Sequence, residues 1–175
     1  MEAERTLRIF AGVPLCEEAR ASIERAFPGR SIPPRNWHVT LCFLGNIAES
    51  AALRVVARVS PGPRFEFTFD AFGAFPSPER ARVLWLGPSR PVPRLTEIAG
   101  RIREAATAEG IKTDARPYAP HLTLAKLDRP KDLRGYLSVL PPVNVRMDVD
   151  RVVFFESRLG KGPPVYAEWR AIALA

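Results

Sequence analysis

The chain has 175 residues, of which 46% are hydrophobic and 26% are charged, and its formal net charge is +7. This composition is typical of a globular domain and excludes a disordered tail. No apolar run approaches the roughly 20 residues that span a bilayer, and the N-terminus has no signal-peptide pattern. We therefore predict a cytoplasmic protein with no membrane segment.

The hydrophobic periodicity predicts alternating strands and helices, and one order of elements occurs twice. The expected elements are strands at 7–13, 37–45, 64–76, 82–87, 121–127, 147–159 and 165–174, with helices at 16–27, 49–59, 94–110 and within 130–140. Both halves contain a strand, a helix, a loop with Pro and Arg, a strand with the HxTL frame, a second helix and a long strand. We predict an α+β fold in which residues 1–175 form one domain of two pseudo-symmetric lobes. The expected pseudo-repeats are 6–78 and 81–175, each with helices and an antiparallel sheet.

Both histidines of the chain stand in the same four-residue frame, HVTL at 38–41 and HLTL at 121–124. With 7 Thr and 16 Leu in the chain, this coincidence has a chance of roughly one in 10⁵. Side chains alternate across a strand, so His38 and Thr40 share one face, as do His121 and Thr123. If the lobes are related by an approximate two-fold axis, two imidazoles and two hydroxyls face one central cleft.

Several chemistries fit these residues poorly. Two histidines without a third ligand make a poor zinc site, and we predict no metal and no cofactor. Cys16 and Cys42 have no metal-binding spacing, and neither stands in a nucleophile frame. The chain has no G-x-S-x-G elbow and no phosphate-binding loop of the Walker type. Acid–base chemistry remains.

Paired imidazoles suit the cleavage of a phosphodiester. Imidazole titrates near pH ~6.5, so one histidine can act as a base while its partner acts as an acid. The hydroxyls of Thr40 and Thr123 can donate hydrogen bonds to the charged phosphate oxygens. Basic residues number 26, of which 22 are Arg, and Arg binds phosphate at two points. The spacing does not decide which histidine is the acid.

The paired frames resemble those of the two-histidine phosphoesterase superfamily. The surrounding segments "LRIFAGV", "HVTLCFLG", "FGAFPSPERARVLWLG", "RPYAPHLTLAKL" and "VVFFESRLGKGPPVYAEW" are similar to its bacterial and archaeal RNA 2′,3′-cyclic phosphodiesterases, also called 2′-5′ RNA ligases. The resemblance implies hydrolysis of a terminal 2′,3′-cyclic phosphate on RNA to a 2′-phosphomonoester. It assigns His38 as the proton donor and His121 as the proton acceptor, with Thr40 and Thr123 on the phosphate.

The resemblance also implies residues that bind the substrate. Phe43 and Lys126 each lie five residues after a histidine, where relatives have an aromatic residue and an Arg beside the terminal base. An offset of five falls on the core face of an ideal strand, so both positions require a bulge or a strand end. Arg35, Arg116 and Tyr118, on the loops before the two frames, are further candidates for binding phosphate or a base. Each could equally be a solvated surface residue, and Phe43 could be a core aromatic.

We predict a monomeric enzyme whose partner is the 3′ end of an RNA. Two alternatives stay open at this stage. A related phosphoesterase could act on a small cyclic nucleotide, and a basic RNA-binding module could use the two histidines structurally.

Overall fold

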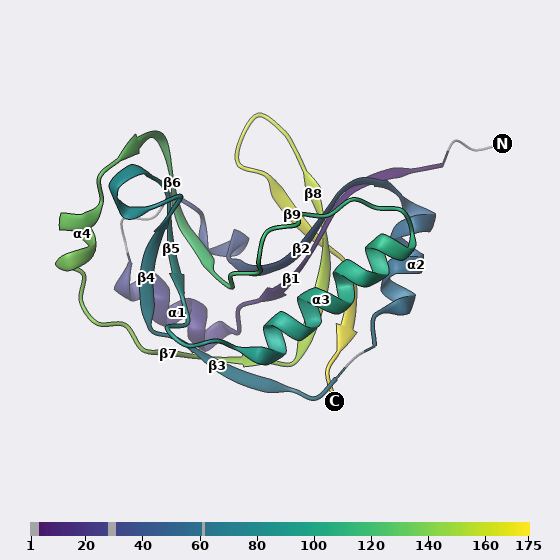
Figure 1. The fold of residues 1–175 in the computed structure, drawn as a ribbon, viewed down its shortest axis with the longest axis horizontal. Helices are drawn as coiled ribbons and strands as arrows, with labels where there is room; N and C mark the ends of the chain where they lie inside the picture. Colours follow the sequence, from purple (N-terminus) through teal and green to yellow (C-terminus); the bar gives the residue numbers. More distant parts are fainter. Residues whose placement is uncertain (1–3, 28–30, 61) are drawn as a thin grey trace.

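The structure is a computed structural model that describes residues 4–27, 31–60 and 62–175. Its centre is a seven-stranded antiparallel sheet with the strand order β4-β5-β6-β2-β1-β8-β9 (Figure 1). The strands of this sheet are β1 (Thr6–Pro14), β2 (His38–Ala48), β4 (Ala71–Phe75), β5 (Ala81–Gly87), β6 (Leu122–Lys131), β8 (Arg151–Arg158) and β9 (Val165–Ala173). The α+β prediction is confirmed, whereas the division into pseudo-repeats stays a prediction.

Helices cover one face of this sheet. The helices are α1 (Glu17–Ala26), α2 (Glu49–Arg58), α3 (Pro93–Ala108) and α4 (Arg134–Ser138), with 3₁₀ turns η1 (Pro34–Asn36) and η2 (Pro78–Arg80). In α3 the buried residues recur with a helical period, among them Leu95, Ile98 and Ile102, so one stripe faces the core. This helix packs on β2 and α2 (Figure 1). As predicted, the chain turns at Gly110, where φ is +72°.

The sheet contributes alternate residues to this core. Val39 and Leu41 of β2, and Leu122 and Leu124 of β6, are at most 4% exposed. His38 lies on the other face with a smaller cluster of buried residues, formed by Phe10, Val153 and Phe155. The helices therefore leave the histidine-bearing face of the sheet free.

Two segments predicted as single long strands each divide into two. Residues 64–76 form β3 (Phe65–Phe69) and β4, and residues 147–159 form β7 (Val145–Val149) and β8. The breaks fall at Asp70 and Asp150, where the chain leaves a small β3-β7 sheet and enters the large one. At Asp70 the carboxylate accepts hydrogen bonds from the main-chain N–H and the hydroxyl of Ser89, which fixes the turn. Hydrophobic alternation continues through both turns, so it did not reveal them.

Candidate active site

The two histidine strands meet at one point of the sheet. Of the described residues in β2 and β6, Val39 and Leu122 form the antiparallel pair that joins the strands. Both side chains point into the core. The residues on either side of this pair therefore point to the opposite face: His38 and Thr40 in β2, Thr123 in β6 and His121 immediately before β6. All four are partly exposed, as an alternating strand requires.

Both strands carry a bulge at the leucine of the HxTL frame. The pairing of β2 with β1 skips Leu41, and the pairing of β6 with β5 skips Leu124. The extra residue reverses the alternation, so Phe43 and Lys126 lie on the histidine face of the sheet. Phe43 is accordingly 60% exposed and contacts Phe10, with ring centroids 5.6 Å apart. The bulge that an offset of five requires is thus present in both strands.

A main-chain carbonyl two residues earlier in the chain holds each imidazole. His38 Nδ1 lies 2.8 Å from the carbonyl oxygen of Asn36, and His121 Nδ1 lies 2.7 Å from that of Ala119. A carbonyl only accepts hydrogen bonds, so Nδ1 must carry the proton in both rings. The Nε2 atoms are left to take up or release a proton. For His38 this atom lies 3.0 Å from the hydroxyl of Thr40.

The environment favours the neutral form of both rings. Burial lowers the pKa of His38 to about 4, opposed by the hydrogen bond to the Asn36 carbonyl. Positive charge on His121 or Lys126 lowers this pKa further. Burial also lowers the pKa of His121, against a raising effect of the Ala119 carbonyl.

Aromatic rings from neighbouring strands surround both histidines, and no sequence motif marked these rings as part of the site. Phe10 and Tyr166 lie beside His38, with ring centroids 4.7 and 5.3 Å from its own. Phe75 lies 4.9 Å from His121 and Trp85 6.5 Å from it. The aromatic-rich segments around residues 72–75 and 153–155 were a possible signal, but only strand order brings them to the histidines.

Two glycines make room for these rings. A Cβ on Gly12 would lie 3.0 Å from the carbonyl oxygen of Val39 and 3.4 Å from Cδ2 of His38. A Cβ on Gly73 would overlap the indole of Trp85, which pairs with Thr123 across the β5–β6 ladder.

The Gly73→Ala variant is therefore expected to unfold more easily, by about 1–3 kcal/mol, because the added methyl group must displace a large ring. The matched control is Gly100→Ala, where the new methyl group meets nothing within 4 Å inside α3. That change should raise stability by about 0.5–1 kcal/mol. Urea unfolding followed by circular dichroism measures both. Equal stability of the two variants would contradict this account of Gly73.

The remaining predicted residues, Tyr118, Arg116 and Arg35, differ in the hydrogen bonds and ion pairs that they form. Tyr118 donates a hydrogen bond from its hydroxyl to the carbonyl of Thr40, 3.1 Å away, and so joins the second loop to the first histidine strand. Burial raises the pKa of Tyr118. Arg116 is 86% exposed and forms a forked ion pair with Asp114. Arg35 has no hydrogen bond or ion pair to any residue that the structure describes, and it lies with His38 in the wall of a small cavity of about 110 Å³.

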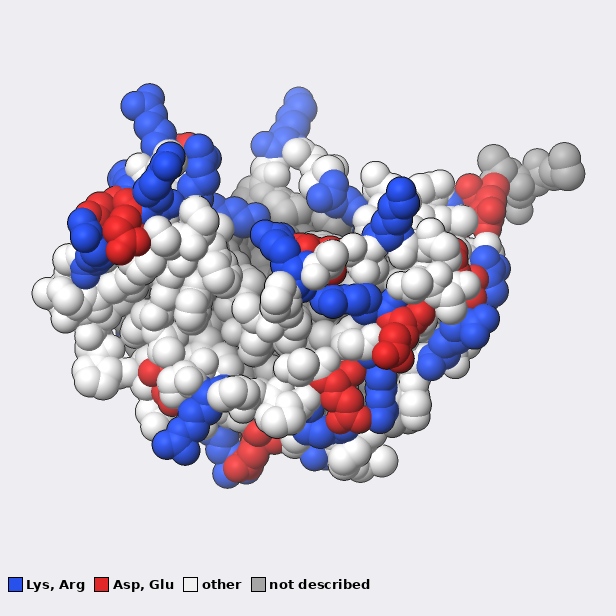
Figure 2. All heavy atoms as spheres, in the orientation of Figure 1, with Lys and Arg blue, Asp and Glu red and all other residues white. Residues whose placement is uncertain are grey.

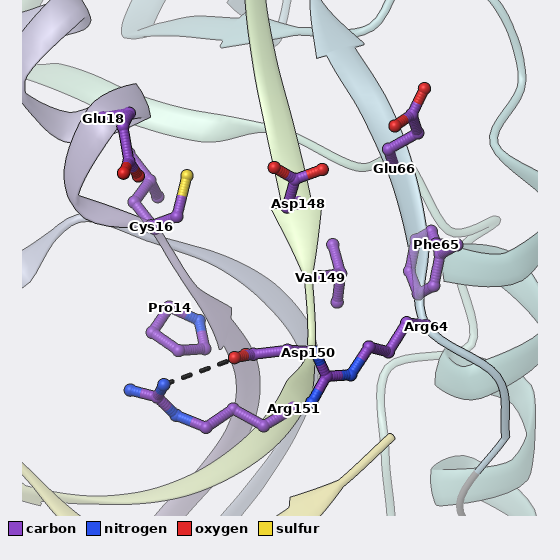
Figure 3. Close-up of a pocket in the computed structure, with 11 residues that line it drawn as sticks. Pro14, Cys16, Glu18, Arg64, Phe65, Glu66, Asp148, Val149, Asp150 and Arg151 are labelled. Carbon is purple, nitrogen blue, oxygen red and sulfur yellow. Dashed lines mark ion pairs between the residues drawn. The ribbon is translucent and has the colours of Figure 1, made fainter. Parts of the chain in front are cut away.

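A larger cavity of about 610 Å³ lies away from the histidines, between the end of β1 and the β3-β7 sheet (Figure 3). Four carboxylates line it, from Glu18, Glu66, Asp148 and Asp150. Arg151 pairs with Asp150 there at 3.8 Å. These four carboxylates outnumber the two Arg side chains of the lining, Arg64 and Arg151, which disfavours a phosphate ligand, so the larger cavity is not the candidate site.

Two further findings concern the predicted absence of a metal site and of a membrane segment. Among residues 4–27, 31–60 and 62–175, no cluster of three or more His, Cys, Asp or Glu could hold a metal ion. Within the same ranges, no helix has the length and apolar character that crossing a membrane requires. The absence of a metal requirement stays a prediction.

Comparison with known proteins places this chain in a family. The model of the 2′-5′ RNA ligase superfamily matches residues 12–161. The RNA 2′,3′-cyclic phosphodiesterase of Escherichia coli is 30% identical, over 95% of this chain and 96% of its own length. The enzyme of the same name from Aquifex aeolicus is 28% identical, over 87% and 85%.

Solved structures agree with this placement. The crystal structure of Escherichia coli LigT with 3′-AMP superposes with a TM-score of 0.82 at 26% identity, covering 97% of this chain and 99% of LigT. A Thermus thermophilus protein superposes with a TM-score of 0.79 at 26% identity, covering 96% and 98%. The chain belongs to the 2′-5′ RNA ligase superfamily.

Proposed function

We propose that this chain hydrolyses a terminal 2′,3′-cyclic phosphate on RNA to a 2′-phosphomonoester. One observation carries the proposal: the Val39–Leu122 pair puts two histidines with the same tautomer, and two threonines, on one face of the sheet. The name shared by the relatives, RNA 2′,3′-cyclic phosphodiesterase, agrees with such chemistry.

In the proposed reaction, water attacks phosphorus in line with the departing ribose 3′ oxygen. His121 Nε2 takes a proton from the water as the new P–O bond forms. His38, protonated at Nε2, gives its proton to the 3′ oxygen as the P–O3′ bond breaks. Thr40 and Thr123 donate hydrogen bonds to the non-bridging oxygens, where negative charge accumulates. If the 5′-hydroxyl of a second RNA replaced water, the same two roles would join the RNA ends through a 2′-5′ bond, and the roles would exchange when such a bond is cleaved back to the cyclic phosphate.

The unliganded site is not in the protonation state that this reaction needs. With the pKa of His38 near 4, its ring is neutral at pH 7. A bound phosphate anion would stabilise the imidazolium and raise this pKa. Substrate binding would thus help to charge the acid.

The bulged residues would hold the terminal base. Phe43 presents an exposed ring for stacking, and Lys126 offers a positive charge on the same face of the sheet. Because an ammonium lacks the flat surface of a guanidinium, stacking would depend on Phe43. Tyr118 would act by fixing the backbone at Thr40. For Arg116, the ion pair with Asp114 would have to open or rearrange before the guanidinium could bind a phosphate.

Arg35 would bind a phosphate further along the RNA. In the cavity beside His38 it faces Arg20, whose Nε is buried without a hydrogen-bond partner. Glu168 also lines this cavity, but its carboxylate pairs with Arg151 at 3.2 Å. Lys and Arg side chains project along the upper edge of the molecule, over β6 and the loop between β8 and β9 (Figure 2). The RNA chain would follow these charges.

The Arg35→Ala variant is expected to weaken binding of an RNA oligonucleotide while affecting a 2′,3′-cyclic mononucleotide little. The slope of log affinity against log salt should fall in magnitude by about one, for one lost phosphate contact. Arg54→Ala is the matched control, because Arg54 lies on α2 and pairs with Glu109 at the C-terminal end of α3. Titration of fluorescent RNA at several salt concentrations measures the slope. An unchanged slope would remove Arg35 from the RNA path.

The function is tested by incubating the protein with an RNA oligonucleotide that ends in 2′,3′-cyclic phosphate, in EDTA. Formation of a 2′-phosphate supports the proposal and its metal-free mechanism together. A 3′-phosphate would overturn the assignment of the leaving oxygen. Turnover of cyclic mononucleotides alone would favour a small-nucleotide enzyme, and RNA binding without turnover would favour a binding module. A monomeric, cytoplasmic protein without a cofactor completes the proposal.

A further inference from the structure

Asn36 is a buried polar residue beside the candidate acid. Its side chain is 6% exposed, in contrast to the apolar residues that form the rest of the described core. Burying an amide costs free energy unless its hydrogen bonds are satisfied. Asn36 satisfies this need with a long-range bond: Nδ2 donates to the carbonyl oxygen of Pro164, 2.9 Å away.

This bond connects the first histidine to a distant loop. Pro164 ends the loop between β8 and β9, at residues 159–164. The same Asn36 accepts the Nδ1 proton of His38 on its own main-chain carbonyl, at 2.8 Å. One residue therefore bonds the imidazole through its backbone and the loop through its side chain.

The second histidine lacks such an anchor. His121 has an equivalent carbonyl, that of Ala119, at 2.7 Å. The methyl side chain of Ala119 cannot form a hydrogen bond. The carbonyl of Ala119 therefore lacks the side-chain anchor that Asn36 has in its bond to Pro164. The two halves thus share the bond to Nδ1 and differ in what holds it.

We propose that Asn36 is a positioning residue for His38: anchored to Pro164, it fixes the carbonyl that selects the Nδ1–H tautomer and aims Nε2 at the reacting phosphate. The assignment of His38 as the acid rests on the proposed function, whereas the control of its tautomer does not. In the wrong tautomer Nε2 would carry the proton of the neutral ring, and the protonated ring would lack its partner at Nδ1. Loss of the anchor should therefore reduce kcat more than it raises KM.

Nuclear magnetic resonance can test the tautomer directly, because the chain has only two histidines. Imidazole ¹⁵N shifts report which nitrogen is protonated, and a His121→Gln variant assigns the two sets of signals. In the wild type both rings should be in the Nδ1–H form. In Asn36→Ala the His38 ring should become a mixture of tautomers while His121, the internal control, is unchanged. The pKa of His38 should fall as well, since the bond to Asn36 raises it.

Kinetics and two further variants complete the test. With a cyclic-phosphate substrate, Asn36→Ala should lose about 10- to 100-fold in kcat, the size of a misplacement of about 1 Å. Asn46→Ala, at an exposed Asn of β2, the strand that carries His38, should change neither tautomer nor rate. Asn36→Asp keeps the volume but cannot donate to Pro164, and it should reproduce the tautomer change if the alanine variant fails to fold.

A purely structural Asn36 would give a different result. Its variants would lower the melting temperature, yet His38 would stay in the Nδ1–H form with its kcat retained, and that outcome overturns the proposal. A wild type that hydrolyses no cyclic phosphate would instead refute the proposed function. The tautomer measurement would still stand in that case, so the two failures are distinguishable.

Discussion

His38→Ala and His121→Ala are each expected to lose about 10²- to 10⁴-fold in the rate of cyclic-phosphate hydrolysis, the usual contribution of a general acid or base. Both rings lie on the face opposite the helix-covered core, so the variants should remain folded. Hydrolysis of an RNA oligonucleotide with a cyclic end measures the loss. Circular dichroism at the assay temperature is the control. Removal of both histidines should cost little more than removal of one, because they act as a unit.

A substrate with a good leaving group separates the two roles. An aryl phosphodiester releases its leaving group without protonation, so it does not need the acid. His38→Ala should therefore recover much of its activity on such a substrate, and His121→Ala should not. Recovery by His121→Ala alone would reverse the assignment. Equal activity of both variants and wild type on the RNA would show that the histidines are structural.

Acid should destabilise the folded protein through His38 at a pH where the carboxylates of Asp114 and Asp132 are still charged. In the unfolded chain this histidine has a pKa near 6.5, and in the folded chain burial lowers it to about 4. The unfolded state thus binds a proton first, so stability is complete above pH 6.5 and falls as the pH drops towards 4. A shift of this size corresponds to about 3 kcal/mol. His121 adds to this loss of stability at acidic pH, since its pKa is also lowered.

Urea unfolding between pH 7 and pH 4 measures this effect, and His38→Gln is the variant to compare. In this pH window the stability of His38→Gln should depend much less on pH than that of the wild type. The stability of His121→Gln should keep most of the wild-type dependence. Asp114 and Asp132 lie outside the window, because their Arg partners hold the pKa of each near 2, below the ordinary 3.8. Their ion pairs are lost only below about pH 4. If the free energy of unfolding changed equally with pH in the wild type and in His38→Gln, this explanation of acid destabilisation would be contradicted.

Most of the elements and the candidate site could be predicted from the sequence by itself. Strand and helix periodicity is local, so β1, α2, α3 and β9 could be predicted within a few residues. The repeated HxTL frame identified both histidines and both threonines, and alternation placed them opposite the core. Even the bulges could be anticipated, because Phe43 and Lys126 needed one to reach the same face.

Only the tertiary structure decided what surrounds these residues. Strand order brings Phe10 to His38 and Trp85 to His121, and no local pattern encodes which strands become neighbours. The bond from Asn36 to Pro164 spans 128 positions of the chain. Periodicity reports which side of a strand is buried, because successive side chains alternate between the two faces of a strand. The tautomer, pKa and orientation of a histidine depend on atoms that only folding brings together.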